Sequence, residues 1–87
     1  MALSFPNHSR SYDATRRAVR FWGHDSAMEA SFFVTEDALK SMHPAVEQGE
    51  AAMLDAFDRN RERIWAAASR AYAQGRKGSY ELGTTDI

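Results

Sequence analysis

Two runs of β-forming residues stand out in the first third of the chain, where apolar and polar positions alternate. They cover residues 18–22 and 28–34 and are separated by the sequence Gly-His-Asp-Ser at 23–26. Such a turn sequence between two β-rich runs is typical of a hairpin. We therefore predict two antiparallel strands here, with a short earlier strand near residues 11–12 beside them.

The length of the hairpin loop decides which side chains share a face, because side chains alternate along each strand. A four-residue loop at 23–26 pairs Arg20 with Glu29, which is a favourable cross-strand charge contact. This register predicts an outer face that carries two large aromatic residues, Trp22 and Phe33. The inner face, directed at the helices, is then predicted to hold Val19, Phe21, Met28, Ala30 and Phe32.

The remainder of the chain changes to the three- and four-residue spacing of helices. Thr35 is predicted to cap a short helix that ends at His43, because Pro44 follows. A longer helix is predicted to begin between residues 45 and 50 and to run to Gln74, with Gly75 after its end. Its apolar stripe consists of Val46, Met53, Leu54, Phe57, Ile64, Ala68 and Ala71, with Trp65 and Tyr72 at its edges.

A final alternating segment at residues 79–82 predicts one more strand. The chain of 87 residues is thus expected to form a single α+β domain over residues 1–87. It has two layers: an antiparallel sheet of three or four strands, and two helices packed on one face. Each buried apolar side chain contributes roughly 1.5–3 kcal/mol, whereas each ordered residue costs about 1.5 kcal/mol. Because these sums nearly cancel in so short a chain, we expect further burial in a homodimer.

Composition excludes several kinds of site. The chain has no cysteine, so disulfides, thiolate metal sites and cysteine nucleophiles are ruled out. No signal peptide and no apolar run of membrane-spanning length is present, so we expect a cytoplasmic protein without membrane contact. The three histidines, His8, His24 and His43, share no spacing that predicts a metal site. His24 beside Asp25 is better explained by turn chemistry than by acid–base catalysis, so we predict no catalytic residue and no cofactor.

Core and turn residues spread over nearly the whole chain carry a resemblance to a known family. They are Phe5-Pro6, Tyr12, Val19-Arg20-Phe21, Gly23, the stretch from Phe32 to Leu39, Phe57, the Arg61/Ile64/Ala68 series and Asp86. In these positions the chain resembles a small bacterial family known as domain of unknown function 1488. The resemblance implies a short bacterial α+β protein, and it supplies no catalytic residue, cofactor or partner. The family pattern ends in Asp-Phe, and this chain departs from it with Ile87.

The sequence favours a non-enzymatic accessory or protein-interaction module that self-associates, with an unidentified protein as a further candidate partner. The predicted contact residues are Arg20, Trp22 and Phe33 on the outer face of the sheet. The alternative cover for that face is intramolecular, with the segment at residues 3–6 folding across it and Phe5 on top.

A second hypothesis is a small-molecule or anion-binding protein that uses Arg61 and the basic loop at 75–78. Arg61 lies at the edge of the helical stripe, where it either pairs with Asp58 or grips a carboxylate from outside the chain. Nucleic acid is not an expected partner, since acidic residues are interleaved with the basic ones around Trp22.

Overall fold

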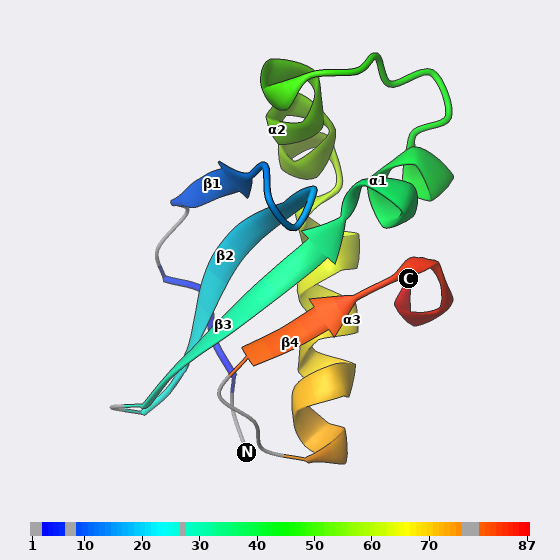
Figure 1. Ribbon diagram of the computed structural model, residues 1–87. Helices are drawn as coiled ribbons and strands as arrows, with labels where there is room; N and C mark the ends of the chain where they lie inside the picture. Colours follow the sequence, from blue (N-terminus) through cyan, green and yellow to red (C-terminus); the bar gives the residue numbers. More distant parts are fainter. Residues whose placement is uncertain (1–2, 7–8, 27, 76–78) are drawn as a thin grey trace.

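A four-stranded sheet forms one layer of the protein and three helices form the other (Figure 1). The computed structural model describes residues 3–6, 9–26, 28–75 and 79–87. The two-layer α+β class predicted from the sequence is confirmed. The strands lie in the order β1 (Arg10–Asp13), β2 (Ala18–Asp25), β3 (Met28–Thr35) and β4 (Ser79–Leu82). The helices are α1 (Glu36–Met42), α2 (Glu50–Arg59) and α3 (Arg61–Gln74), and a 3-10 turn, η1 (Thr84–Asp86), follows β4.

The β2–β3 hairpin has the predicted faces but a different register. Arg20 lies opposite Phe33, and Phe21 lies opposite Phe32, so the predicted pair of Arg20 with Glu29 is wrong. The strands run to Asp25 and start again at Met28, which leaves a two-residue turn in place of the predicted loop of four. Because both loops have an even number of residues, the error moves the pairing along the strand without exchanging the two faces.

The longer hairpin also changes the environment of Met28, which was predicted to face the core. It lies at the far end of the hairpin, where the strands extend past the helices (Figure 1), and it is 58% exposed. Gly23, predicted to start the loop, instead lies within β2 opposite Ala30. The inner-face prediction therefore holds for four of its five residues: Val19, Phe21, Ala30 and Phe32 are all buried.

The predicted long helix is in fact two helices, α2 and α3, that are interrupted at Asn60. This residue leaves the helical conformation, with φ −122° and ψ 23°. Its side-chain amide donates a 2.8 Å hydrogen bond to the carbonyl of Ala56, which satisfies an acceptor at the end of α2. The apolar stripe nevertheless continues through the break, since Phe57 before it and Ile64 after it are both fully buried.

The last strand returns to the sheet as predicted, but it lies parallel to β3, so the sheet is mixed rather than purely antiparallel. A parallel pair needs a long crossover connection. Here the connection contains all three helices. Phe33 is thereby aligned with Glu81, and Val34 with Leu82.

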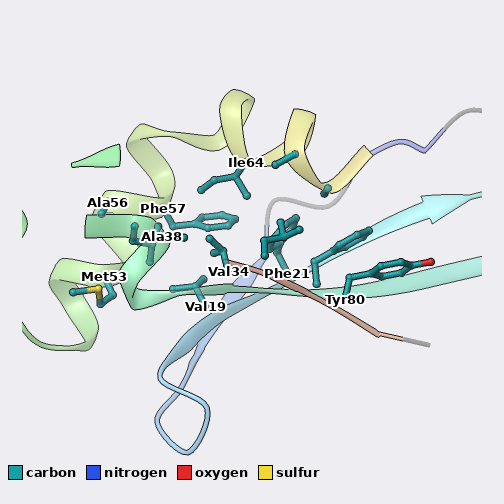
Figure 2. Close-up of a cluster of buried hydrophobic side chains, with 14 of the residues drawn as sticks. Val19, Phe21, Val34, Ala38, Met53, Ala56, Phe57, Ile64 and Tyr80 are labelled. Atoms are coloured by element: carbon teal, nitrogen blue, oxygen red, sulfur yellow. The ribbon is translucent and has the colours of Figure 1, made fainter. Parts of the chain in front are cut away.

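The core lies between the helices and the inner face of the sheet. Figure 2 shows Phe57 and Ile64 from the helices packed over Val19, Phe21 and Tyr80 from the strands. Buried side chains of all three helices belong to this one cluster. All three helices therefore cover the same face of the sheet.

The N-terminal segment packs on the inner face, so the alternative cover for the outer face, with Phe5 on top, is wrong. The Phe5 ring stacks on Trp65 of α3, with centroids 5.1 Å apart and planes at 5°. Ser4 forms two backbone hydrogen bonds with His24, each 2.8 Å long. A Cβ atom at Gly23 would lie 2.9 Å from the Phe5 ring, so this glycine provides the space in which the segment lies.

Candidate functional site on the outer face of the sheet

The outer face of the sheet is built from rows of side chains that strand register places next to one another. One row crosses the whole sheet and contains Ser11, Arg20, Phe33 and Glu81 on β1, β2, β3 and β4. The neighbouring row contains Trp22, Ser31 and Ser79. Three of the four predicted binding residues, Arg20, Trp22 and Phe33, are thus together on this face. In the part of the chain that the structure describes, no helix lies over them.

Two arginines stack on the aromatic rings of this face. The guanidinium carbon of Arg16 lies 4.1 Å from the ring centroid of Phe33. That of Arg20 lies 4.9 Å from the Trp22 ring and 5.8 Å from Phe33. A guanidinium group over a ring is attracted by the electron-rich ring face. These four residues, Arg16, Arg20, Trp22 and Phe33, are named the arginine–aromatic stack below.

The stack corrects one assumption of the sequence analysis, which left both aromatic rings exposed to water. Phe33 is only 7% exposed, because Arg16 lies over it. Trp22 is half-buried. The apolar area that this face offers to a partner therefore comes mainly from Trp22. Phe33 is covered by Arg16, so a partner would contact the arginine rather than the ring.

The turn between β1 and β2 aims Arg16 at the sheet. The Asp13 carboxylate accepts a 3.1 Å hydrogen bond from the backbone N–H of Arg16. The next residue, Arg17, has φ 53°, which is unusual for a residue with a side chain. The Arg17 carbonyl accepts a 3.0 Å hydrogen bond from the backbone N–H of Glu36, at the start of α1. The strained turn is therefore fixed at both ends, and Arg16 projects over the outer face.

Neither guanidinium of the stack is paired with a carboxylate among the described residues. Arg20 donates a 3.2 Å hydrogen bond to the Ser31 hydroxyl, and its buried Nε has no acceptor. Arg17 and Arg59, in contrast, are paired with Glu36 and Asp55. The outer face thus holds two arginines side by side that form no ion pair with any described carboxylate. Planar guanidinium groups of this kind bind carboxylates well.

Arg61, the fourth predicted binding residue, lies in the helix layer, away from the other three. Its guanidinium donates a 2.8 Å hydrogen bond to Asp58, which confirms the predicted pairing. Arg10 of β1 binds the same carboxylate through two hydrogen bonds, of 2.8 and 3.0 Å. The hydrogen bond from Arg10, reinforced by the charges of both arginines, lowers the pKa of Asp58 below its usual value. The cluster ties β1 to the junction of α2 and α3.

The alternative anion site combined Arg61 with the basic loop at 75–78. Arg61 begins α3, and Gly75 follows its last residue. A helix of this length separates its ends by roughly 20 Å. Arg61 and Gly75 therefore do not meet in one site, and residues 76–78 lie outside the described part of the chain.

The histidines that the structure describes belong to different elements. His24 lies 3.8 Å from Glu29 across the hairpin, and the backbone N–H of His43 bonds to Leu39 at the end of α1. Residue 8 lies outside the described ranges. Among residues 3–6, 9–26, 28–75 and 79–87, no three His, Asp or Glu side chains are grouped so that they could hold a metal ion. None of the helices there has the length and apolarity that crossing a membrane requires.

A second polar cluster, which the sequence analysis missed, joins β1 to α1. The Tyr12 hydroxyl donates a hydrogen bond to the Glu36 carboxylate, and this bond raises the pKa of Tyr12. Arg17 lies 3.3 Å from the other oxygen of Glu36. Burial of this carboxylate between a phenol and a guanidinium holds the strained turn against α1. Its position indicates a structural role.

Two parts of the outer-face site were not predicted from the sequence: Glu81 and the position of Arg16 over Phe33. Alternation along residues 79–82 could have placed Glu81 on the outer face, opposite to the buried Tyr80 and Leu82. Its alignment with Phe33 depends on the parallel register of β4, for which the sequence has no short-range signal. The reach of Arg16 depends on the conformation of the turn.

Comparison with known proteins gives one family and one fold match. The family model described as "Protein of unknown function (DUF1488)" matches residues 3–82. A crystal structure of a protein of unknown function from the DUF1488 family of Shewanella loihica PV-4 is similar in fold, with a TM-score of 0.81. It is 16% identical in sequence, and the match covers 92% of this chain and 90% of that chain. No curated protein matches the chain.

Proposed function

The chain belongs to DUF1488, a family of proteins of unknown function, and we propose that it is a non-enzymatic interaction module that self-associates through the outer face of its sheet. The observation that carries the proposal is the arginine–aromatic stack on a sheet face that no described helix covers. Antiparallel sheets often leave one face to water, but that face is then mainly polar. Here its centre holds two aromatic rings instead.

A protein partner would use this face better than water does. Covering the half-buried Trp22 removes apolar area that contributes roughly 1.5–3 kcal/mol when fully buried. Trp and Arg are also the residues most enriched among those that dominate the energy of protein interfaces. Arg16 and Arg20 already lie over rings, so less side-chain entropy is lost when a partner orders them.

The charges of the face favour a protein over a nucleic acid. Arg16 and Arg20 are accompanied on the same face by Asp13, Glu29 and Glu81. A polyanion gains affinity from many uncompensated cations. A face with positive and negative side chains instead suits a partner whose surface also carries charges of both signs. A second copy of the chain has the same mixture, and a homodimer would bury the face that each copy leaves uncovered.

Analytical ultracentrifugation at tens of micromolar protein tests the proposal. We expect wild type to sediment as a dimer and Trp22→Ser to shift toward monomer, while Trp22→Phe retains most of the association. Met28→Ser is the matched control, because Met28 is the exposed large hydrophobic residue of the described chain but lies at the end of the hairpin. Circular dichroism melting of each variant separates loss of the interface from loss of the fold.

A monomeric wild type would refute self-association. A wild-type dimer that Met28→Ser disrupts and Trp22→Ser does not would place the interface at the hairpin end instead.

A further inference from the structure

The central row of the outer face has a charge pattern that is complementary to itself. Phe33 on β3 lies in the middle, with Arg20 beside it on β2 and Glu81 beside it on β4. Adjacent strands are about 4.8 Å apart, so the cation and the carboxylate lie at similar distances on opposite sides of Phe33. This arrangement has a definite consequence for the way in which two copies can pack.

On the basis of the self-association proposed above, we infer that two copies pack outer face to outer face about a two-fold axis that runs parallel to β3. Rotation about this axis exchanges the two sides of the row. It therefore brings β2 of one copy over β4 of the other, while each Phe33 remains near the axis. Arg20 of each copy then faces Glu81 of the other, and the contact occurs twice.

The distances in stacked sheets suit this contact. Two sheets packed face to face are about 10 Å apart, and in aligned packings their mean strand directions stay within about 30° of each other, as an axis parallel to β3 requires. A long arginine side chain and a glutamate side chain can together cross such a gap. The charged groups that meet there are those of the central row.

Neither Arg20 nor Glu81 has a charged partner among the residues of its own chain that the structure describes. Glu81 is exposed and forms no hydrogen bond or ion pair among the described residues. Within the same described ranges, Arg20 donates a hydrogen bond to the Ser31 hydroxyl, and its Nε has no acceptor. Arg16, stacked on Phe33 near the axis, adds a second cation beside the incoming carboxylate. A carboxylate between two guanidinium groups is the arrangement that this chain forms internally at Asp58.

Charge exchange tests the pairing. Arg20→Glu and Glu81→Arg each place like charges opposite one another in both symmetry-related contacts. Like-charge contacts at an interface cost several kcal/mol, so each variant alone should dimerise roughly 100-fold more weakly than wild type. In an equimolar mixture both contacts become Glu–Arg again, and we expect a heterodimer with an affinity near that of wild type.

Arg59→Glu and Glu62→Arg are matched controls, since they make the same charge changes on exposed residues of the helix layer. Both should dimerise as wild type does. Glu81→Arg requires no repacking, because the side chain is exposed, so it remains a valid test even if Arg20→Glu lowers the melting temperature.

The outcomes separate this inference from the proposed function. A wild-type dimer that survives Glu81→Arg, or single variants that stay monomeric when mixed, would overturn the Arg20–Glu81 pairing and leave self-association intact. A monomeric wild type would overturn both.

Discussion

Phe57 should be among the residues on which the stability of the protein depends most. Its side chain is fully buried in the middle of the helical stripe. The ring centroid lies 5.1 Å from that of Phe21 on the sheet, and the guanidinium carbon of Arg61 lies 5.0 Å from the same ring. Replacement by alanine removes the ring from the contact between the two layers and takes away the nearer of the two rings over which Arg61 lies.

The expected cost is large relative to the whole stability. Truncation of a buried phenylalanine to alanine costs roughly 3–5 kcal/mol. A domain of 87 residues has a free energy of unfolding of about 4–13 kcal/mol. Phe57→Ala should therefore remove roughly a quarter of the stability at the upper end of that range and nearly all of it at the lower end.

Urea denaturation followed by circular dichroism measures this loss. With a slope near 2 kcal/mol per molar urea, which is typical of small domains, a loss of 4 kcal/mol moves the midpoint by about 2 M. Phe57→Leu is the matched control and should lose less than half as much, because most of the volume is retained. A Phe57→Ala protein with the wild-type midpoint and slope would refute the placement of Phe57 between the layers.

Three further predictions concern other parts of the fold. The pKa of Asp58 is lowered in the folded protein, so its carboxylate stabilises the fold above the unfolded-state pKa of about 3.9, and this contribution is lost as the pH falls through the lower folded-state pKa. Asp58→Asn should therefore flatten the dependence of stability on pH below about pH 4. Melting temperatures that fall with acid as steeply in Asp58→Asn as in wild type would contradict this. Gly23→Ala should cost roughly 1–3 kcal/mol through collisions with Phe5 and Leu3. The same substitution in a Phe5→Ala background should cost less, because the closer of the two contacts is removed. Equal losses of melting temperature in both backgrounds would contradict the contact with Phe5. Finally, gel-shift assays with DNA and RNA at about 150 mM salt should show no complex at micromolar protein, and micromolar or tighter affinity would show that the acids of the outer face do not prevent polyanion binding.

The sequence predicted faces better than it predicted registers. Parity alone places Val19 and Phe21 on one side and Trp22 and Phe33 on the other, and parity survives any even change in loop length. The pairing of Arg20 with Glu29 required the loop length itself. The turn signal at 23–26 misled that prediction, because Gly23 provides space for Phe5 within a strand rather than for a turn.

The helix break has a similar explanation. A stripe with three- and four-residue spacing continues from Phe57 to Ile64 whether or not the backbone stays helical between them. The interruption depends on Asn60, whose side chain bonds to the backbone of the preceding turn. Asparagine competes in this way with helical hydrogen bonds, but asparagines also occur within helices. The continuous apolar stripe was therefore the stronger signal, and it predicted one unbroken helix.

At the candidate site, the sequence identified Arg20, Trp22 and Phe33 but not the contacts that make them a unit. The position of Arg16 over Phe33 follows from the backbone of the β1–β2 turn, where Arg17 has a positive φ. The alignment of Glu81 with Phe33 follows from a strand that returns from the other end of the chain. Both are tertiary effects, and neither leaves a local pattern in the sequence.

The parallel pairing of β4 with β3 has a consequence for the order of folding. β1, β2 and β3 are joined by short turns, whereas 43 residues, at positions 36–78, separate β3 from β4. Closing a loop of that length costs about 3 kcal/mol of chain entropy before any contact forms. Non-local pairings of this kind form slowly, so β4 should join the sheet after the hairpin and its helices, and its amides should exchange with solvent sooner than those of β2. Because Glu81 lies on β4, a partner that binds it would act on this final step and slow the detachment of the strand.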